Sequence, residues 1–170
     1  MSLELISGLL LPDQVLPLFE AYTKLLVQND PSFAAYLEQQ HFSEECRHLE
    51  KKYGPPDGRL ILALWDGVPA GCVALQRLDA QNGELKRLYV KPEYRGRAIA
   101  KHLLDAILTE AKTIGYAAVL LDTLPFLQSA IHLYQAWGFV EIPRYNESPM
   151  ADAIYMKLDL TQQDGPSPSC

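Results

Sequence analysis

The sequence predicts one mixed α/β domain, because strand signals and helical signals alternate along a chain of 170 residues. Asp66-Gly67 separates two apolar runs, and a two-residue Asp-Gly link of this kind is typical of a β-hairpin. Later, a stretch of helical periodicity lies between two apolar runs, which is the pattern of a βαβ unit. A chain of this length forms one ordinary domain, which we expect to span residues 1–160. Residues 161–170 are polar with Gly and Pro, and we expect a disordered tail there.

Helical signals dominate the first third of the chain. Residues 13–27 carry apolar side chains at spacings of three and four, which predicts an amphipathic helix. Asp30 before Pro31 is a helix-start signal and predicts a second short helix, and Ser43 opens a third. The Gly- and Pro-rich loop at residues 53–58 ends this helical section.

Strand signals then take over. Residues 60–65 and 68–75 form the predicted hairpin. A turn signal at residues 81–83 leads into a third strand over residues 84–90. We expect these three strands to form an antiparallel meander.

The remaining elements complete the βαβ unit and add two closing strands. Residues 99–114 have helical spacing, and residues 117–121 form a short continuous apolar run, as expected for a strand buried on both faces. A further helix is expected to end near Ala136. The last two strands are expected to begin near residues 138–140 and to cover residues 153–160.

Composition and charge exclude several classes of protein. With 48% hydrophobic and 21% charged residues, the chain falls within the range of globular proteins. The 15 Lys and Arg against 21 Asp and Glu leave a net charge of −6, which argues against generic binding to nucleic acid or anionic membranes. No apolar run could span a bilayer and the N-terminus lacks a signal-peptide pattern, so we expect a cytoplasmic protein. The cysteines and histidines show no metal-ligand spacing, and we expect no metal.

A basic strand-to-helix junction at residues 95–101 is the first candidate site. Such a junction exposes backbone N–H groups without helical partners at the positive end of the helix dipole, where an anion can bind. Arg95, Arg97 and Lys101 concentrate positive charge there in a chain that is acidic as a whole. The junction can hold a pyrophosphate or can be a tight turn with solvated side chains, and this segment alone favours neither. Neither a P-loop ending nor a GxGxxG sequence is present.

A second cluster lies at residues 130–139, where Tyr134 precedes the helix stop Gly138. Taken alone, Tyr134 would be a half-buried packing residue. Together, the two clusters make the chain resemble the GCN5-related N-acetyltransferase (GNAT) superfamily, whose members transfer the acetyl group of acetyl-CoA to an amine. The resemblance covers most of the chain, and residues 138–146 and 154–158 are similar to a bacterial branch of small, mostly uncharacterised members. It implies a GNAT-like fold in which the two parallel strands of the βαβ unit splay apart.

The resemblance also implies roles for individual residues. The backbone of residues 88–90 would hydrogen-bond the pantetheine arm like an added strand, and residues 96–101 would hold the pyrophosphate. Tyr134 would donate a proton or a hydrogen bond to the departing thiolate. Glu84 would be the general base for the attacking amine, directly or through water, and the alternative for Glu84 is an exposed carboxylate at the start of a strand. The complete set implied for acetyl-CoA is Leu88, Tyr89, Val90, Arg95, Gly96, Arg97, Ala98, Ile99, Ala100, Lys101 and Tyr134.

Two positions depart from the family pattern. Ala98 stands where the pyrophosphate motif has its first glycine, and a methyl group there is costly only if the position needs a positive φ. Leu127 stands where many members have an asparagine that touches the cofactor, so that contact is missing or is supplied by Gln128 or Ser129. We expect weaker cofactor binding at worst.

These departures leave three hypotheses for the function. The first is an N-acetyltransferase that binds acetyl-CoA and a primary amine in a ternary complex, with direct attack of the amine. The second is a non-catalytic acyl-CoA-binding regulatory module, and the third is an acidic protein-interaction domain without a small-molecule site. The sequence does not name the acceptor: a small metabolite or free amino acid, a peptide N-terminus and a lysine side chain all stay open. A homodimer is expected only because family members often form one.

Overall fold

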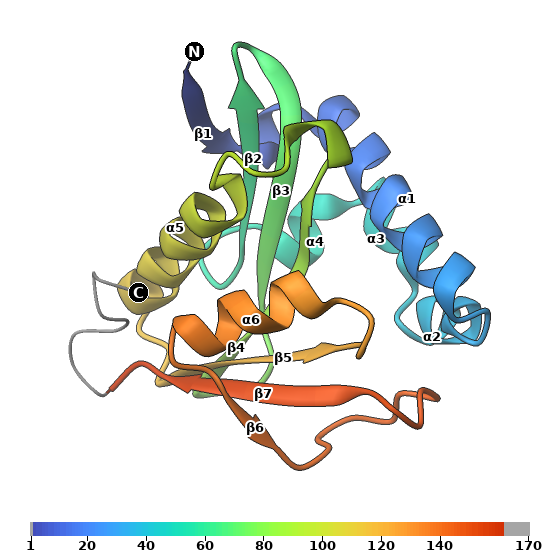
Figure 1. Ribbon diagram of the computed structural model, residues 1–170. Helices are drawn as coiled ribbons and strands as arrows, with labels where there is room; N and C mark the ends of the chain where they lie inside the picture. Colours follow the sequence, from blue (N-terminus) through green and yellow to red (C-terminus); the bar gives the residue numbers. More distant parts are fainter. Residues whose placement is uncertain (1, 162–170) are drawn as a thin grey trace.

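Seven strands form one mixed sheet in the computed structural model, which describes residues 2–161 (Figure 1). The strands are β1 (Leu3–Ser7), β2 (Arg59–Trp65), β3 (Val68–Arg77), β4 (Asn82–Val90), β5 (Ala118–Thr123), β6 (Val140–Ile142) and β7 (Ile154–Asp159). They lie in the order β1-β2-β3-β4-β5-β7-β6, and all neighbours are antiparallel except β4 and β5. The predicted meander and the parallel pair are therefore confirmed.

Helices cover both faces of this sheet (Figure 1). They are α1 (Pro12–Asn29), α2 (Phe33–Gln39), α3 (Phe42–Arg47), α4 (Leu49–Tyr53), α5 (Ile99–Ile114), α6 (Gln128–Ala136) and two 3₁₀ turns, η1 (Gly8–Leu10) and η2 (Pro92–Tyr94). The α1 to α4 group covers one face, and α5 and α6 cover the other. The third predicted helix is divided at His48 into α3 and α4. Most of the expected tail, residues 162–170, lies outside the described residues.

Helix α5 shows how the sequence pattern becomes packing. Its apolar face includes Leu103, Leu104 and Ile107, each 0% exposed against the sheet. Burying a leucine side chain contributes about 1.5–3 kcal/mol, so this face anchors the helix firmly. The helix ends at Gly115, whose φ of 103° lies in the left-handed region that closes helices. None of the helices formed by residues 2–161 has the length and apolar character needed to cross a membrane.

Strands β4 and β5 pair only at one end. Their parallel ladder joins residues 82–84 to residues 118–120. Beyond this ladder the strands diverge, as their different directions in Figure 1 show. Within the described chain, residues 85–90 therefore have no strand partner on the β5 side, and the splayed pair implied by the resemblance is present.

A β-bulge interrupts β4 at Arg87. Ala74 of β3 pairs with Lys86 of β4, and Cys72 pairs with Tyr89. A step of two residues along β3 therefore corresponds to a step of three along β4. Arg87 adopts a φ of 61°, a left-handed conformation that costs a non-glycine residue about 1–2 kcal/mol. In a regular strand, Lys86 and Arg87 would point to opposite faces, but the bulge turns both toward the α1 to α4 side. There both donate hydrogen bonds to Oε1 of Gln40, over 2.8 Å and 2.9 Å.

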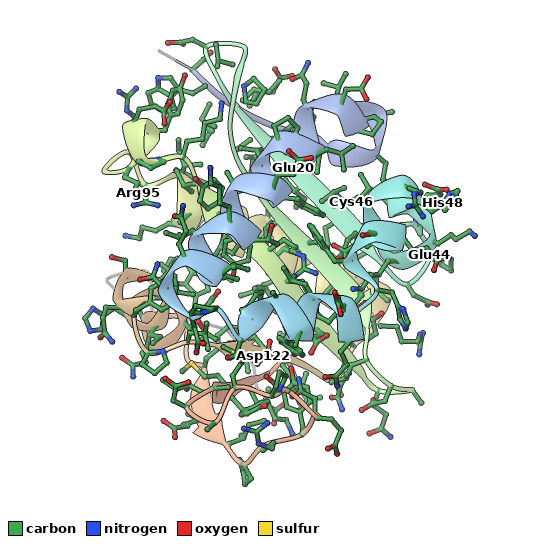
Figure 2. The ribbon with its side chains drawn as sticks, turned by 90° about the vertical axis from the view of Figure 1, so that its right-hand side faces the viewer. Glu20, Glu44, Cys46, His48, Arg95 and Asp122 are labelled. Carbon is green, nitrogen blue, oxygen red and sulfur yellow. The ribbon has the colours of Figure 1, made fainter. Side chains whose placement is uncertain are left out.

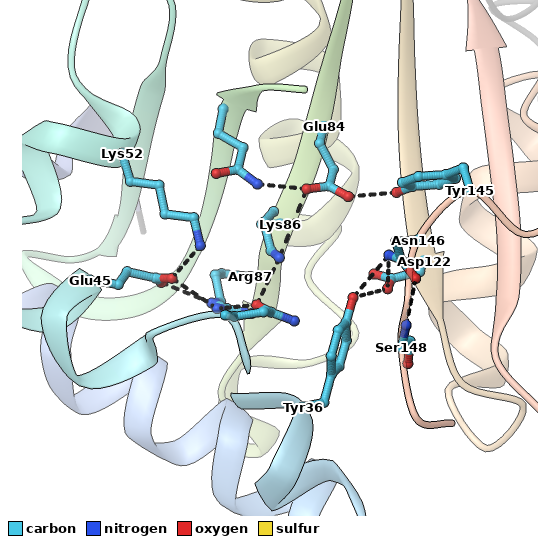
Figure 3. A network of polar contacts seen from close by, with 12 residues as sticks. Tyr36, Glu45, Lys52, Glu84, Lys86, Arg87, Asp122, Tyr145, Asn146 and Ser148 are labelled. Carbon is cyan, nitrogen blue, oxygen red and sulfur yellow. Dashed lines mark hydrogen bonds and ion pairs between the residues drawn. The ribbon is translucent and has the colours of Figure 1, made fainter. Parts of the chain in front are cut away.

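A buried ion pair ties this bulge to α3. Nε and Nη2 of Arg87 donate to Oε2 and Oε1 of Glu45 over 3.1 Å and 3.0 Å (Figure 3). Lys52 donates to the same carboxylate over 2.7 Å, and the Tyr53 hydroxyl donates over 2.9 Å. Burial alone would raise the pKa of the Glu45 carboxyl, but Arg87 and Lys52 hold that pKa at about 2.

We predict that Glu45→Gln lowers the free energy of unfolding by about 3–5 kcal/mol at neutral pH, because it leaves Arg87 buried without a counter-ion. The folded-state pKa of Glu45 is about 2, below its ordinary value of 4.5. The contribution of its charge is therefore complete above pH 4.5 and is lost as the pH falls toward 2. Denaturant unfolding at a series of pH values should show that the difference in free energy of unfolding between wild type and variant becomes smaller below pH 4.5.

Glu44→Gln is the matched control, because it removes the same charge from an exposed position of the same helix. Its effect on the free energy of unfolding should stay within about 0.5 kcal/mol. A loss no larger for Glu45→Gln than for Glu44→Gln would show that the buried pair does not hold the fold together.

Candidate active site

A groove of about 630 Å³ runs along the free edge of β4. Residues 88–90 form one wall, the start of α5 closes one end, and the start of α6 lies opposite. Tyr22 and Leu25 of α1 also line it. Of the residues predicted to touch the cofactor, all except Arg97 and Tyr134 line this groove. The topology thus brings together segments that the sequence analysis treated separately.

The junction between β4 and α5 supplies the end of the groove that can bind an anion. The N–H groups of the first turn of α5 have no helical acceptors, and residues 99–101 of that turn line the groove. Gly96 has a φ of 81°, and no atom other than those of Gly96 and its two chain neighbours lies within 4 Å of the position that a Cβ would take there. Ala98 has a φ of 62°, so the position does need a left-handed conformation, and its methyl group is costly.

The two arginines of the junction behave differently. Nε of Arg95 donates to the carbonyl of Val90 over 3.3 Å, and Arg95 lines the groove. The guanidinium of Arg97 lies over the rings of Trp65 and Tyr94, at 5.0 Å and 5.4 Å from their centroids. Arg97 is outside the groove lining, and its cation–π contacts instead hold the junction against the sheet.

Tyr134 lines a second, smaller cavity of about 30 Å³ between β4 and β5. Tyr22, Leu88 and Leu127 line both spaces, so the cavity adjoins the groove. Tyr134 is 5% exposed, and its hydroxyl forms no hydrogen bond with any residue in the described range 2–161. Burial raises the pKa of Tyr134 well above its ordinary value, so the phenol is protonated at pH 7.

Leu127 occupies the point where the groove and the cavity meet. It is the N-cap residue of α6, and its side chain makes no capping hydrogen bond. The two polar neighbours suggested as substitutes for asparagine, Gln128 and Ser129, both line the groove. Gln128 is partly committed, because its amide donates to the carbonyl of Pro125.

Glu84 is the last residue of β4 that pairs with β5, and it is 5% exposed. Gln76 donates to its Oε1 and Tyr145 to its Oε2, each over 2.6 Å (Figure 3). Nζ of Lys86 lies 3.9 Å from Oε1. The β4 wall of the small cavity begins at Leu85, so Glu84 is set back from it by one position. Any proton that Glu84 receives from the cavity must therefore pass through a neighbouring group or a water molecule.

Asp122 is a carboxylate of the cavity wall that the sequence analysis missed. It lies near the end of β5, where Tyr36 of α2 and Nδ2 of Asn146 both donate to its Oδ2, the latter over 3.0 Å. In Figure 2, Asp122 lies in the lower part of the view and Arg95 at its left side. The sequence held a signal for this residue, because Asp122 follows directly on the apolar run at residues 117–121.

Within the described residues, no group of three His, Cys, Asp or Glu side chains is placed to hold a metal ion.

A family model described as the acetyltransferase (GNAT) family matches residues 19–139. The chain belongs to this family. The predicted recognition and the predicted enzyme class, an acyltransferase, are thereby confirmed. An uncharacterized N-acetyltransferase of Schizosaccharomyces pombe is 34% identical over 142 residues, which cover 82% of this chain and 87% of that protein.

Solved structures of acetyltransferases share the fold. An acetyltransferase of Streptococcus agalactiae has a TM-score of 0.73 at 20% identity, and the match covers 93% of this chain and 98% of that one. An N-acetyltransferase of Thermoplasma acidophilum, solved in complex with coenzyme A, has a TM-score of 0.66 at 20% identity, with coverage of 94% and 99%. The predicted α/β fold class is confirmed by these likenesses.

We predict that Ala98→Gly raises the free energy of unfolding by about 0.5–1 kcal/mol. The left-handed conformation costs alanine about 1–2 kcal/mol, and the larger entropy of glycine in the unfolded chain offsets part of the relief. Ala106→Gly is the control, because Ala106 lies inside α5, where glycine should lower stability by about 1 kcal/mol. Thermal or denaturant unfolding of both variants checks the opposite signs, and a loss of stability in both would refute the strain at Ala98.

Proposed function

We propose that the protein transfers the acetyl group of acetyl-CoA to a primary amine by direct attack within a ternary complex. One observation carries the proposal: the free edge of β4 and the start of α5 line a groove, and this groove adjoins the cavity lined by Tyr134, whose hydroxyl has no hydrogen-bond partner among the described residues. Family membership supports acetyl transfer, and the Thermoplasma neighbour with coenzyme A supports the choice of cofactor.

Acetyl-CoA supplies an activated acetyl thioester, and the groove offers partners for its other parts. Backbone groups of residues 88–90, free of a strand partner toward β5, would pair with the amides of the pantetheine arm. The N–H groups at the start of α5, together with Arg95 and Lys101, would hold the pyrophosphate. The N–H group of Val90 would polarise the acetyl carbonyl. Arg97 would act indirectly, by fixing the junction through its ring contacts.

Glu84 would receive the proton that the acceptor must lose before it attacks. An alkyl amine with a pKa near that of lysine, about 10.4, is almost fully protonated at pH 7, so a base is needed. The carboxylate of Glu84 already accepts a hydrogen bond from Tyr145, which extends toward the β5 side of the gap (Figure 3). We therefore assign the transfer to a path through Tyr145 or a water molecule.

Tyr134 would stabilise the thiolate that leaves as the C–N bond forms and the C–S bond breaks. Burial raises its pKa above that of a thiol, which is ordinarily about 8.5. The shared proton therefore stays mainly on the phenol oxygen, and Tyr134 acts as a hydrogen-bond donor to the developing negative charge.

We predict that Tyr134→Phe lowers kcat by about 10²-fold while acetyl-CoA binding is kept, because only the donor to the leaving thiolate is lost. Thiol release measures turnover. Thermal unfolding with acetyl-CoA, and with NAD as control ligand, measures binding. A ligand that binds only the native state, present at about one hundred times its dissociation constant, adds about 2.7 kcal/mol to the free energy of unfolding. This raises Tm by several degrees.

Tyr116→Phe is the matched control for this variant, because it removes a hydroxyl that donates to the carbonyl of Asp57, away from the gap. Its turnover should equal that of the wild type. Unchanged turnover in Tyr134→Phe would remove the role of Tyr134. Acetyl-CoA binding by the wild type without thiol release from any amine would favour the non-catalytic acyl-CoA-binding module instead.

We predict that Glu84→Gln lowers kcat/KM by about 10²-fold at pH 7 and that the deficit shrinks as the pH approaches the pKa of the acceptor amine. At high pH the amine is already neutral, so the base has less to contribute. A pH profile of thiol release measures this, with Glu141→Gln on the exposed strand β6 as the charge-matched control. A deficit that is the same at every pH would indicate a structural role for Glu84.

A further inference from the structure

The polar network on the α1 to α4 side of the gap contains more cations than anions. Within the described residues, Lys52, Lys86 and Arg87 are connected through hydrogen bonds and ion pairs to two carboxylates, Glu45 and Glu84 (Figure 3). Glu45 serves two of the cations, since Arg87 and Lys52 both donate to it at hydrogen-bond distance. Glu84 is therefore the carboxylate left for Lys86, at 3.9 Å.

Lys86 is a buried ammonium with weak compensation. Its side chain is 7% exposed, and its one hydrogen bond to a described residue goes to the neutral amide oxygen of Gln40. Glu84 lies 3.9 Å away, and both of its oxygens already accept short hydrogen bonds from other residues. The neighbouring Arg87 donates hydrogen bonds through Nε and Nη2, whereas its Nη1 forms no hydrogen bond with any described residue. Lys86 and Arg87 both line the cavity.

Asp122 faces Lys86 across the gap. The last paired residues are Glu84 and Leu120, and two residues further along each strand are Lys86 and Asp122, which therefore lie on the same face of the separated strands. Only neutral groups, the Tyr36 hydroxyl and the Asn146 amide, hold the Asp122 carboxylate, and no cation of the described chain forms an ion pair with it.

A nearby cation that could have neutralised Asp122 is directed elsewhere. Arg144 belongs to the loop that carries Asn146, but it donates to the carbonyls of Ser148 and Met150, each over 2.8 Å. One wall of the cavity thus presents an ammonium that forms no hydrogen bond with a carboxylate of the described residues, and the opposite wall presents a carboxylate held by neutral groups. Separated buried charges are costly, and a ligand that carries both opposite charges would relieve both walls at once.

We propose that the acceptor is a free amino acid, whose carboxylate binds Lys86 and whose amine binds Asp122, an inference that rests on the acetyl transfer proposed above. Nη1 of Arg87 offers a second donor to the same carboxylate. Once the amine has become an amide it carries no positive charge, so Asp122 holds the product less tightly than the substrate. The same arrangement orients the amine toward β5, beside the gap into which the acetyl group must reach.

The test compares thiol release from acetyl-CoA by the full chain with a panel of free amino acids, each paired with its own carboxamide. The carboxamide keeps the amine and the side chain but has no negative charge. We expect kcat/KM for the best amino acid to exceed that of its carboxamide by about tenfold or more, through KM. Dipeptides in the panel test whether a carboxylate further from the amine is accepted.

Variants separate the two walls. Lys86→Gln should bring the ratio of amino acid to carboxamide close to one, and Lys86→Arg should retain the preference because it keeps the charge. Asp122→Asn should raise KM for both members of each pair alike, since both share the amine. Lys112→Gln removes a lysine charge from the exposed end of α5 and should leave the ratio unchanged.

Each outcome decides between the inference and the function on which it rests. If acetyl-CoA raises Tm but carboxamides, dipeptides or simple amines react as fast as free amino acids, or no amino acid reacts, the inference is overturned and the acetyl-CoA site stands. If acetyl-CoA gives neither a shift in Tm nor thiol release with any amine, the proposed function itself fails. The comparison in the wild type decides the preference even where a Lys86 variant does not fold.

Discussion

The ion pair between Arg87 and Glu45 holds β4 in a bulged shape that a regular strand would not keep. The bulge gives Arg87 a positive φ, and the two hydrogen bonds to Glu45 compensate for that strain while they attach α3 to the sheet. Because the extra residue shifts the pleat, Lys86 and Arg87 both face the helices of the N-terminal section. The charge pattern of the cavity wall is therefore a consequence of this one irregularity.

The separation of β4 from β5 gives the site two distinct approaches. On the α6 side, Tyr134 belongs to the same packed cluster as Leu103 and Leu104 of α5, so its position is fixed by the main hydrophobic core. On the opposite side, the gap is bordered by two groups of polar contacts, one that runs from Glu45 to Glu84 and one around Asp122 (Figure 3). A donor that lies along the edge of β4 and an acceptor that enters from the polar side would meet at the gap without competing for the same contacts.

Most of the fold could be predicted from local sequence patterns, because the hairpin turn, the periodicity of α5 and the βαβ order are all short-range signals. The junction at residues 95–101 could be found for the same reason. The polar wall could not, because its contacts join residues distant in the chain: Arg87 and Glu45 are 42 positions apart, and Tyr36 and Asp122 are 86 apart. The division of the third helix at His48 and the sign of φ at Ala98 likewise depend on how the chain packs. Neither residue type predicts these features.

Two of the strained positions within the described chain lie beside the groove. Of the four non-glycine residues with a positive φ, Arg87 directly precedes the groove wall at residues 88–90 and Ala98 lies at the anion-binding end of the groove. Each conformation costs about 1–2 kcal/mol, a sizeable share of the few kcal/mol by which a domain is stable. Arg87 is held by its buried ion pair, whereas Ala98 is held mainly by the packed face of α5 that follows it. Since the core and the ion pair oppose relaxation from the two ends, the segment between β4 and α5 keeps its exposed N–H groups in place before any ligand arrives, so that less ordering has to accompany binding.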